Sequence, residues 1–417
     1  MKILITNIVT LNAGDAAILY AMIDVLRAAF GSDTEFVVYD KHGDAPARYY
    51  PELEFRKLLY LTRKSPKVFF KLGRWAIKHN LPLLPRLLLT STERRDLVEY
   101  KNADLIVSSG GTYLVENYSL AARIFDYQIS LYFEKPLVFF TQSLGPFADP
   151  SNRKALTPIF EQSIAILVRD ELSSRNLADL GASRTRIHVA ADAAFALSDL
   201  AALESAKLPV ARSGRSLRVA ISVREWRHFK SVDPAQGMKQ YIDALRAVSR
   251  HLVNKHDAEI TYLSTCQGMP EYWTDDSKLA QQIVDGQPET ALPSVSVDSS
   301  FHHPAELAKM LKNYDLVIAT RMHMAIIALS VGTPVLPIAY EFKMQELFER
   351  LGQARWVQDM ETLSPDTFIS AVDQFLDELP ELRGPLFTAV ERERASAAAA
   401  GEIVKHAYDE WRQVNHR

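Results

Sequence analysis

The feature that most constrains the fold of this chain is the recurrence of short, β-branched apolar runs separated by longer amphipathic stretches. In the first half these runs are KILITNI, EFVVYD, ADLIVSSG, KPLVFFTQS and AILVRD. Apolar runs of this length are typical of buried strands, and the stretches between them have the period of amphipathic helices. Strands that alternate with helices predict a mostly parallel, doubly wound sheet.

A second series of apolar runs follows, comprising RVAISVRE, AEITYLST, DLVIAT and TPVLPIAY. Between the two series, residues 199–218 are polar and rich in small residues, which indicates an interdomain linker. The sequence therefore predicts an α/β protein with two Rossmann-like domains that face each other across a cleft. The chain from about Ser364 onward has a helical pattern and is expected to cross back onto the first domain. The predicted domains are 1–205, 206–380 and, for the C-terminal helical segment, 381–417.

Composition excludes several classes of protein. A chain of 417 residues with 47% hydrophobic and 24% charged residues has the composition of a soluble protein with room for two domains. Its net charge of -3 gives no reason to expect nucleic-acid binding. Because Cys266 is the only cysteine, an internal disulfide and a cysteine-based zinc site are excluded. The N-terminus lacks the pattern of a signal peptide and no run is long enough for a membrane span, so we expect a cytoplasmic protein.

Residues 319–340, ATRMHMAIIALSVGTPVLPIAY, place two basic side chains where a predicted strand turns into a helix. Arg321 and His323 fall in the first turn of this helix, which is predicted to end at Gly332. A cation there opposes the helix dipole, which favours negative charge at the N-terminus, and a visiting anion would explain it. The alternative is an arginine paired with a nearby carboxylate and a histidine that caps the helix.

Two further cations are expected at the same edge of the second sheet. Arg224 ends the first strand of the second series, and Arg224, Arg321 and His323 are predicted to converge on one anion. Arginine suits this role because its guanidinium donates two parallel hydrogen bonds to a carboxylate or phosphate. Lys343, in EFKMQELFERLG after the last strand, would add charge, although a surface helix position explains it equally.

The loop after the first strand, NIVTLNAGDAA, is polar and leads into a helix predicted to close at Gly31. Asn12, Gly14 and Asp15 lie at this turn, where backbone N–H groups point outward. The loop lacks the full glycine fingerprint of dinucleotide sites, so NAD binding is not predicted. Asp15 is either a structural N-cap or a carboxylate that orients or deprotonates a substrate hydroxyl.

Two other loops of the first domain are predicted to complete a polar wall suited to a hydroxyl-rich acceptor. Gly110 and Gly111 follow a buried strand in DLIVSSGG, and Gln142 ends the strand in TQSLGPF. Paired glycines permit close approach of a ligand to the backbone, although a tight turn alone would also explain them. Arg169 and Asp170 follow the next strand, where a helix cap with a salt bridge is the alternative to acceptor binding.

No metal site is expected from the histidines. His302 and His303 are adjacent, which is the wrong spacing for one helical face. The remaining candidates, His228, His251 and His256, are scattered in the sequence.

Residues 56–92 stand apart because they contain no acidic residue, while Lys and Arg alternate with Leu, Phe, Trp and Tyr. Basic amphipathic stretches with aromatic residues commonly lie on anionic membrane surfaces. The alternative is an inserted helical hairpin that packs on its own domain or on a second subunit.

Taken together, these motifs resemble the polysaccharide pyruvyl transferase family over nearly the whole chain. The resemblance rests on LNAGDAAIL, DLIVSSGG, TQSLGPF and VRDELS, and most on DLVIATRMHMAIIALSVGTPVL followed by YEFKMQELFERLG. It implies a two-domain fold of the GT-B type. It also implies transfer of pyruvate from phosphoenolpyruvate onto hydroxyls of a sugar, with a cyclic ketal and phosphate as products.

The resemblance also implies roles for the residues. The family's Arg-x-His pair matches Arg321 and His323, and its strand-end arginine matches Arg224. His323 is then the expected general acid or phosphate donor, Arg321 its neighbour in catalysis, and Asp15 the group that activates the acceptor hydroxyl. The donor is expected to bind Arg224, Arg321, His323 and Lys343. The acceptor is expected to bind Asn12, Gly14, Asp15, Gly110, Gly111, Gln142 and Arg169.

The chemistry demands no redox cofactor or metal, and the expected partners are phosphoenolpyruvate and a sugar acceptor that is lipid-linked, nucleotide-linked or polymeric. A lipid-linked acceptor would explain weak binding of residues 56–92 to the inner face of the cell membrane. A nucleotide-sugar glycosyltransferase of the same architecture is the main alternative. A non-catalytic member that binds an anion or sugar is another, and the oligomeric state is left open.

Overall fold

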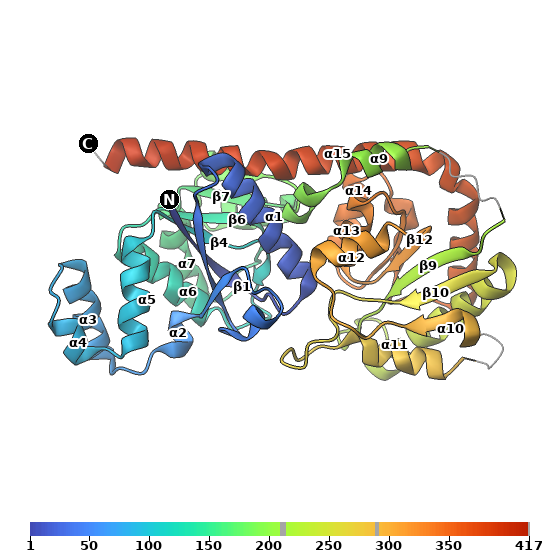
Figure 1. Ribbon diagram of the computed structural model, residues 1–417, viewed down its shortest axis with the longest axis horizontal. Helices are drawn as coiled ribbons and strands as arrows, with labels where there is room; N and C mark the ends of the chain where they lie inside the picture. The colour runs from blue at the N-terminus through green and yellow to red at the C-terminus, as the bar shows by residue number, and fades with distance from the viewer. Residues whose placement is uncertain (209–213, 288–291, 416–417) are drawn as a thin grey trace. The chain divides into compact units, whose positions relative to one another are not determined.

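The computed structural model describes residues 1–208, 214–287 and 292–415 (Figure 1). The chain forms two compact units, each described by itself below. Each unit contains one sheet whose strands all pair in parallel, with helices between most successive strands. The predicted α/β class with two mostly parallel sheets is therefore confirmed. Unit 1 comprises Met1–Thr10, Ile18–Ala193 and the chain from Ser396, and unit 2 comprises Leu11–Ala17 and Ala194–Ala395.

The chain changes unit within two helices. The first turn of α1 (Ala13–Phe30) belongs to unit 2 and the rest of this helix to unit 1. In α15 (Pro365–Asn415), the residues from Ser396 onward belong to unit 1. The domain limits predicted at residues 205 and 380 do not coincide with these points. The predicted linker 199–218 contains α9 (Leu200–Ala206), and its residues 209–213 lie outside the described part of the chain.

The sheet of unit 1 has the order β3-β2-β1-β4-β6-β7-β8, with β5 paired beside β6. The five strands predicted for this half are present. The three that were not predicted are only three or four residues long, too short to show a pattern. The strands are β1 (Lys2–Ile8), β2 (Glu35–Asp40), β3 (Glu54–Lys57), β4 (Leu105–Ser108), β5 (Gly111–Leu114), β6 (Leu137–Leu144), β7 (Ala165–Val168) and β8 (Ile187–Val189).

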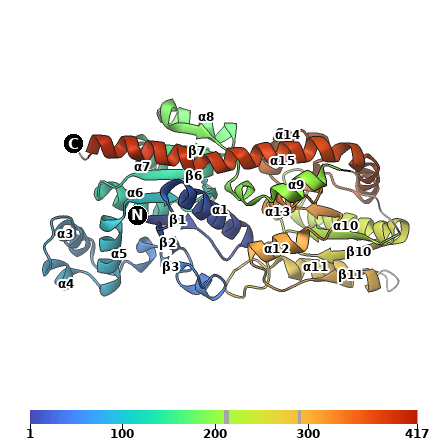
Figure 2. The same ribbon diagram turned by 45° about the horizontal axis from the view of Figure 1, so that its top comes forward.

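Helices cover both faces of this sheet. Alternate strand residues such as Leu4 and Phe139 pack with one set of helices in a single apolar core. The other face meets α1 and the end of α15, which lie side by side in Figures 1 and 2. There Phe30 meets Tyr408 edge to face, with ring centroids 5.5 Å apart. The helices of unit 1 besides α1 are α2 (Leu59–Thr62), α3 (Lys67–Lys78), α4 (Leu84–Leu88), α5 (Ser91–Asn102), α6 (Ala121–Tyr132), α7 (Pro150–Gln162) and α8 (Glu171–Asp179).

The sheet of unit 2 has the order β11-β10-β9-β12-β13-β14. In its register Ser222 pairs with Ala319, and Ala319 with Pro337, so neighbouring strands end at nearly the same level. The loops after β9, β12 and β13 therefore leave the sheet at one edge, where ligands bind in folds of this class. The strands are β9 (Leu217–Ser222), β10 (Ala258–Tyr262), β11 (Val295–Val297), β12 (Leu316–Ala319), β13 (Val335–Ala339) and β14 (Gln358–Asp359).

The predicted helix ends are also found. Gly31 after α1 and Gly332 after the helix at residue 322 have φ of 104° and 82°, a left-handed conformation that favours glycine. The remaining helices of unit 2 are α10 (Pro234–His256), α11 (Asp276–Asp285), α12 (Pro304–Leu311), α13 (Met322–Ser330) and α14 (Phe342–Arg350). Within the described residues, no helix combines the length and the apolar character needed to cross a membrane.

Candidate functional site

Arg321 occupies the N-cap position of α13, directly after β12, and pairs with Asp276 at the start of α11. Its Nε and Nη2 atoms donate to the two carboxylate oxygens of Asp276 at 2.8 and 2.6 Å. The side chains are 11% and 2% exposed. Arg321 is therefore paired with a carboxylate, as the alternative interpretation of the sequence proposed. Its Nη1 atom takes no part in this pair.

The loop after β10 holds Asp276 in place. Its backbone N–H donates to the carbonyl of Cys266 at 2.7 Å, and its carboxylate accepts a hydrogen bond from the hydroxyl of Ser264. Burial acts to lower the pKa of the Arg321 guanidinium, but Asp276 together with Cys266 and Tyr340 raises it well above the ordinary value. Arg321 is thus a permanent cation in a fixed orientation.

His323 lies in the first turn of α13 and packs directly against the backbone of Gly14. A Cβ atom at Gly14 would lie 2.6 Å from Cβ of His323 and 2.9 Å from its Cγ and Nδ1, closer than real side chains approach. The N–H of Ala13 also donates to the carbonyl of Thr265 at 2.9 Å. The loop predicted to bind the acceptor is therefore part of unit 2, in contact with the proposed acid.

Asp15 is not the N-cap of α1, because the helix already begins at Ala13. The capping position belongs to Asn12, whose Oδ1 accepts from the N–H of Gly14 at 2.9 Å and whose carbonyl accepts from Ala16. Asp15 instead lies in the first turn and is buried. Negative charge is favourable at this position of a helix.

Cys266 lies among the charged groups of this cluster. Burial raises the pKa of its thiol to about 12, opposed by Arg321 and supported by the carboxylates of Asp276 and Asp15. Burial likewise raises the pKa of the Tyr272 hydroxyl, with Cys266 and Asp15 acting in the same direction and Arg321 and Arg224 opposing them. Asp15, Cys266, Tyr272 and Arg321 are thus electrostatic neighbours within unit 2.

Arg224 follows β9, and its guanidinium makes cation–π contacts with two aromatic rings. Its guanidinium lies 4.3 Å from the ring centroid of Tyr340 and 5.3 Å from that of Trp226, and its Nη1 donates to the Tyr340 hydroxyl. Burial raises the pKa of Tyr340, while Arg224 and Arg321 both act to lower it. The two arginines predicted to bind an anion therefore share Tyr340 as a neighbour at one edge of the sheet.

Lys343 is the second residue of α14 and lies 3.3 Å from Glu341 through its Nζ atom. Because α14 follows β13, which pairs with β12, Lys343 lies at the same edge as Arg321.

The other residues predicted on the acceptor side lie in unit 1 and have internal contacts. Gln142 is buried, and its Nε2 donates to the carbonyls of Ser108 and Ser109 at 3.1 and 2.8 Å. A Cβ at Gly110 would lie 2.8 Å from Ile18, and Gly111 has a φ of 119°. The paired glycines thus allow a close-packed turn.

Arg169 joins three segments of unit 1. Its Nε donates to Ser143 at 2.8 Å, its Nη2 to Thr112 at 2.7 Å, and its Nη1 pairs with Asp192. Asp170 caps α8 by accepting from the N–H of Ser173 at 2.6 Å. The helix cap and a salt bridge were the expected alternative, and the ion-pair partner of Arg169 is Asp192.

One group of side chains differs from the expectation about metals. No metal site was expected from His251 and His256, but both meet Asp373 of α15 within unit 2. Their ligand atoms all lie within 4.8 Å of one another. Among the residues that the structure describes, this is the one group of three His, Cys, Asp or Glu side chains close enough to hold a metal ion.

Solved structures share the fold. A protein of Listeria monocytogenes assigned as a UDP-N-acetylglucosamine 2-epimerase has a TM-score of 0.59 at 13% identity, covering 98% of this chain and 97% of its own. The UDP-GlcNAc 2-epimerase of Neisseria meningitidis has a TM-score of 0.56 at 13% identity, covering 98% and 100%. At such identities the likeness concerns the fold alone, and it confirms the GT-B-like class.

Sequence comparison is more specific. The amylovoran biosynthesis protein AmsJ of Erwinia amylovora is 26% identical over 417 residues, which cover 94% of this chain and 96% of AmsJ. A family model described as polysaccharide pyruvyl transferase matches residues 12–341, a stretch that includes Asp15, Arg224, Arg321 and His323. The chain therefore belongs to the polysaccharide pyruvyl transferase family.

Proposed function

We propose that this protein transfers pyruvate from phosphoenolpyruvate to two hydroxyls of one sugar unit, forming a cyclic ketal and releasing phosphate. The acceptor belongs to a surface polysaccharide or its lipid-linked precursor. Family membership and the likeness to a protein of amylovoran biosynthesis support this assignment. The observation that carries it is the contact of Gly14 with His323 beside the Arg321–Asp276 pair. This contact brings His323 against the loop that carries Asp15, in the unit that also contains Arg224 and Arg321.

The donor is a small anion with a carboxylate and a phosphate, so its site must supply several N–H donors. Arg224, held by Tyr340 and Trp226, offers a guanidinium of fixed orientation. Arg321 uses Nε and Nη2 for Asp276, which leaves Nη1 outside the pair. The first turn of α13 adds N–H groups without acceptors inside the helix. Lys343 contributes further positive charge.

The reaction begins with proton transfer from the imidazolium of His323 to C3 of phosphoenolpyruvate. C2 then becomes electrophilic, and the first sugar hydroxyl adds to it while Asp15 accepts the hydroxyl proton. The bond between C2 and the phosphate oxygen breaks, and its electron pair leaves with phosphate. The second hydroxyl adds to C2 and gives its proton to phosphate or water. The proton on Asp15 is released to solvent and His323 takes up a proton from solvent, so atoms and charges balance over one turnover and the proposal includes no cofactor.

Asp276 is a positioning residue in this scheme. It acts through Arg321, because the two parallel hydrogen bonds fix the plane of the guanidinium at the start of α13. Gln142 and Arg169 have a comparable task in unit 1, where they hold the turn that contains Gly110 and Gly111. Asn12, Gly14 and Asp15 then provide the acceptor contacts of unit 2.

Binding of the donor substrate distinguishes this proposal from the two alternative functions, nucleotide-sugar glycosyl transfer and non-catalytic binding. Isothermal titration calorimetry with phosphoenolpyruvate and with UDP-sugars is the direct test, using the wild type and Arg224→Ala. Binding of phosphoenolpyruvate that is lost in the variant supports the proposal. Binding of a UDP-sugar with no binding of phosphoenolpyruvate would assign the chain to nucleotide-sugar glycosyl transfer instead. Binding of phosphoenolpyruvate without turnover on any acceptor would indicate a non-catalytic member.

We also propose that the protein binds anionic lipid at the cytoplasmic face of the membrane, where a lipid-linked acceptor would lie. The surface is formed by α2, α3 and α4, which Figures 1 and 2 show beside α5. One face of α3 is anchored in the core by Phe70 and Ile77. The segment is therefore a helical insertion that packs on its own unit, yet its outer face is apolar.

The outer face of α3 has the pattern of an interfacial helix. Val68, Leu72 and Trp75 are 63%, 46% and 45% exposed and follow one another at helical spacing. Lys67 and Lys71 occupy the neighbouring sector of the same helix and are exposed. Apolar side chains beside a row of cations fit the acyl boundary and the headgroups of an anionic bilayer.

Cosedimentation with vesicles tests this surface, comparing phosphatidylcholine alone with mixtures containing phosphatidylglycerol. We expect binding to the anionic vesicles that falls with added salt and is lost in Leu72→Ser/Trp75→Ser. Val414→Ser, at a position 76% exposed elsewhere, is the matched control. Equal binding by the double variant would contradict the proposal. So would an absence of vesicle binding together with a dimer in solution that the double variant abolishes.

A further inference from the structure

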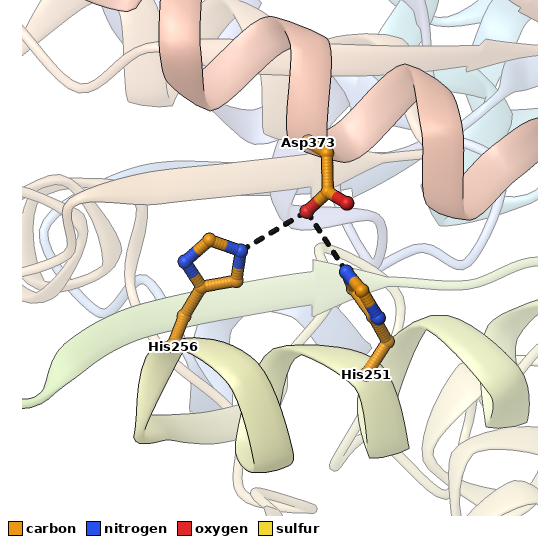
Figure 3. Close-up of side chains that lie close together, drawn as sticks. All are labelled: His251, His256 and Asp373. Carbon is orange, nitrogen blue, oxygen red and sulfur yellow. Dashed lines mark hydrogen bonds and ion pairs between the residues drawn. The ribbon is translucent and has the colours of Figure 1, made fainter.

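A cluster of two histidines and one aspartate links α10 to α15 within unit 2 (Figure 3). Nε2 of His251 and Nε2 of His256 lie 2.8 and 3.0 Å from the same oxygen, Oδ1 of Asp373. The three side chains come from the end of α10 and the first half of α15. They are about one-fifth exposed, at 22%, 19% and 23%. Both imidazoles thus turn their outer nitrogen toward one point.

We propose that His251, His256 and Asp373 form a binding site for a transition-metal dication such as Zn²⁺. The donor set of two imidazole nitrogens and one carboxylate oxygen is one that zinc and its neighbours prefer, whereas Mg²⁺ and Ca²⁺ take mainly oxygen. With three protein ligands, water would fill a fourth position.

The present geometry needs only a small adjustment to accept an ion. Zinc lies about 2.0–2.2 Å from nitrogen and oxygen ligands, which places tetrahedral ligand atoms about 3.3 Å apart. The two nitrogens are 2.8 and 3.0 Å from Oδ1. These two separations need to lengthen by a few tenths of an ångström, and all three ligand atoms already lie within 4.8 Å of one another, so side-chain torsions can bring them around an ion.

Lys255 completes the site without occupying the metal position. Its Nζ lies 2.8 Å from Oδ2 of Asp373, the oxygen that faces away from the two histidines. A carboxylate that binds a metal through one oxygen commonly accepts a hydrogen bond at the other. The ammonium orients the carboxylate, but its charge also opposes a dication. Removing Lys255 should therefore preserve metal binding or tighten it.

A bound ion would cross-link α10 to α15. His251 and Asp373 are separated by 122 residues, and the link fixes the beginning of α15 on unit 2. A cross-link between distant parts of the chain stabilises the folded state when it forms only there. This inference does not depend on the proposed reaction.

The full-length protein, prepared without a histidine tag and stripped with a chelator, is titrated with ZnCl₂ by calorimetry. We expect one equivalent to bind and MgCl₂ to give no heat. His251→Ala and Asp373→Asn should each weaken zinc binding by at least about tenfold, because each removes one of three ligands. His406→Ala, an exposed histidine elsewhere on α15, is the matched control and should bind as the wild type does.

Two further measurements keep the proposal testable if one of the ligand variants folds poorly. Lys255→Ala leaves all three ligands in place and should bind Zn²⁺ at least as well as the wild type. Co²⁺ bound to the wild type should show the visible absorption band typical of an ion with a low coordination number. His251→Ala should not show this band. Zinc binding that is unchanged in His251→Ala and Asp373→Asn would show an adventitious ion only. That result, or the absence of stoichiometric binding, would overturn the proposal. The three residues would then only form hydrogen bonds that connect α10 to α15.

Discussion

Arg321 and Asp276 form a bidentate ion pair that joins the start of α13 to the start of α11. The pair stands beside the contact between His323 and Gly14, so the residue next to the proposed acid is held rigidly. A positive charge at a helix N-terminus is costly by itself. Its carboxylate partner offsets that cost and sets the direction of the guanidinium. The predictions below begin from this relationship.

Replacing Asp276 by alanine should destabilise unit 2 severely. The substitution leaves the Arg321 guanidinium buried without its partner, which typically costs about 3–5 kcal/mol. The free energy of unfolding is measured by urea denaturation followed by circular dichroism. Asp275→Ala is the matched control, since Asp275 only caps α11 and its loss costs about 1 kcal/mol. Similar effects of the two substitutions would contradict the importance of the pair.

Gly14→Ala should abolish activity because the new methyl group would occupy the space of the His323 side chain. We expect the displaced imidazole to lose its position while the rest of the fold persists. The melting temperature of Gly14→Ala/His323→Ala should exceed that of Gly14→Ala, since truncating the histidine relieves the clash. Gly384→Ala is the control, because a Cβ there meets nothing within 4 Å. An active Gly14→Ala enzyme would contradict this contact.

Cys266 should be inert in the folded protein. Burial raises the pKa of its thiol to about 12, so almost no reactive thiolate exists at neutral pH. Iodoacetamide at pH 8 is expected to leave the native protein unmodified and to alkylate one site after unfolding in urea, as read by intact mass. Because the chain has one cysteine, the mass change has a single origin. Rapid alkylation of the native protein would show that the cluster around Cys266 opens.

The buried carboxyl of Asp126 should make the free energy of unfolding of unit 1 depend on pH. Burial raises the pKa of this carboxyl in α6 to about 8, with a contribution from Asp96 and opposition from the N–H of Tyr60 and from Arg123. The folded state thus holds a proton that the unfolded state releases near pH 4. This residue's contribution to stability therefore falls as pH rises from about 4 to about 8, by up to about 5 kcal/mol.

The variant Asp126→Asn tests this dependence. The difference in unfolding free energy between variant and wild type should move in favour of the variant as pH increases from 5 to 8, and then level off. Asp33→Asn, at an exposed position, is the control and should show no comparable trend. A difference that stays constant across this range would mean that Asp126 is ionised in the folded protein.

The sequence predicted the elements of the fold because buried strands and amphipathic helices have local signatures. Nine apolar runs correspond to strands, and Gly31 and Gly332 end the helices expected before them. The short strands β3 and β14 were not predicted, since two to four residues show no periodicity. Their place in the sheets is decided by pairing with neighbours.

Contact partners of the candidate residues were harder to predict than the places of those residues in the fold. Arg321 was expected directly after a strand and lies there, but its partner Asp276 lies 45 residues earlier in the sequence, and only the folded sheet brings the two together. His251 and Asp373 are 122 residues apart for the same reason. Asp15 was offered as a helix cap because helix starts are uncertain by a few residues, and Asn12 takes that position.

We propose that His323 and its neighbours catalyse ketal formation from phosphoenolpyruvate. The most direct measurement incubates the wild type and His323→Ala with phosphoenolpyruvate and a panel of free and lipid-linked sugars, following phosphate release and the mass of the acceptor. We predict phosphate release that requires an acceptor, a pyruvyl ketal on that acceptor, and loss of both in a folded His323→Ala variant. Ketal formation that persists in His323→Ala would contradict the account of the site, and transfer of a sugar from a UDP-sugar without any ketal would contradict the proposed reaction.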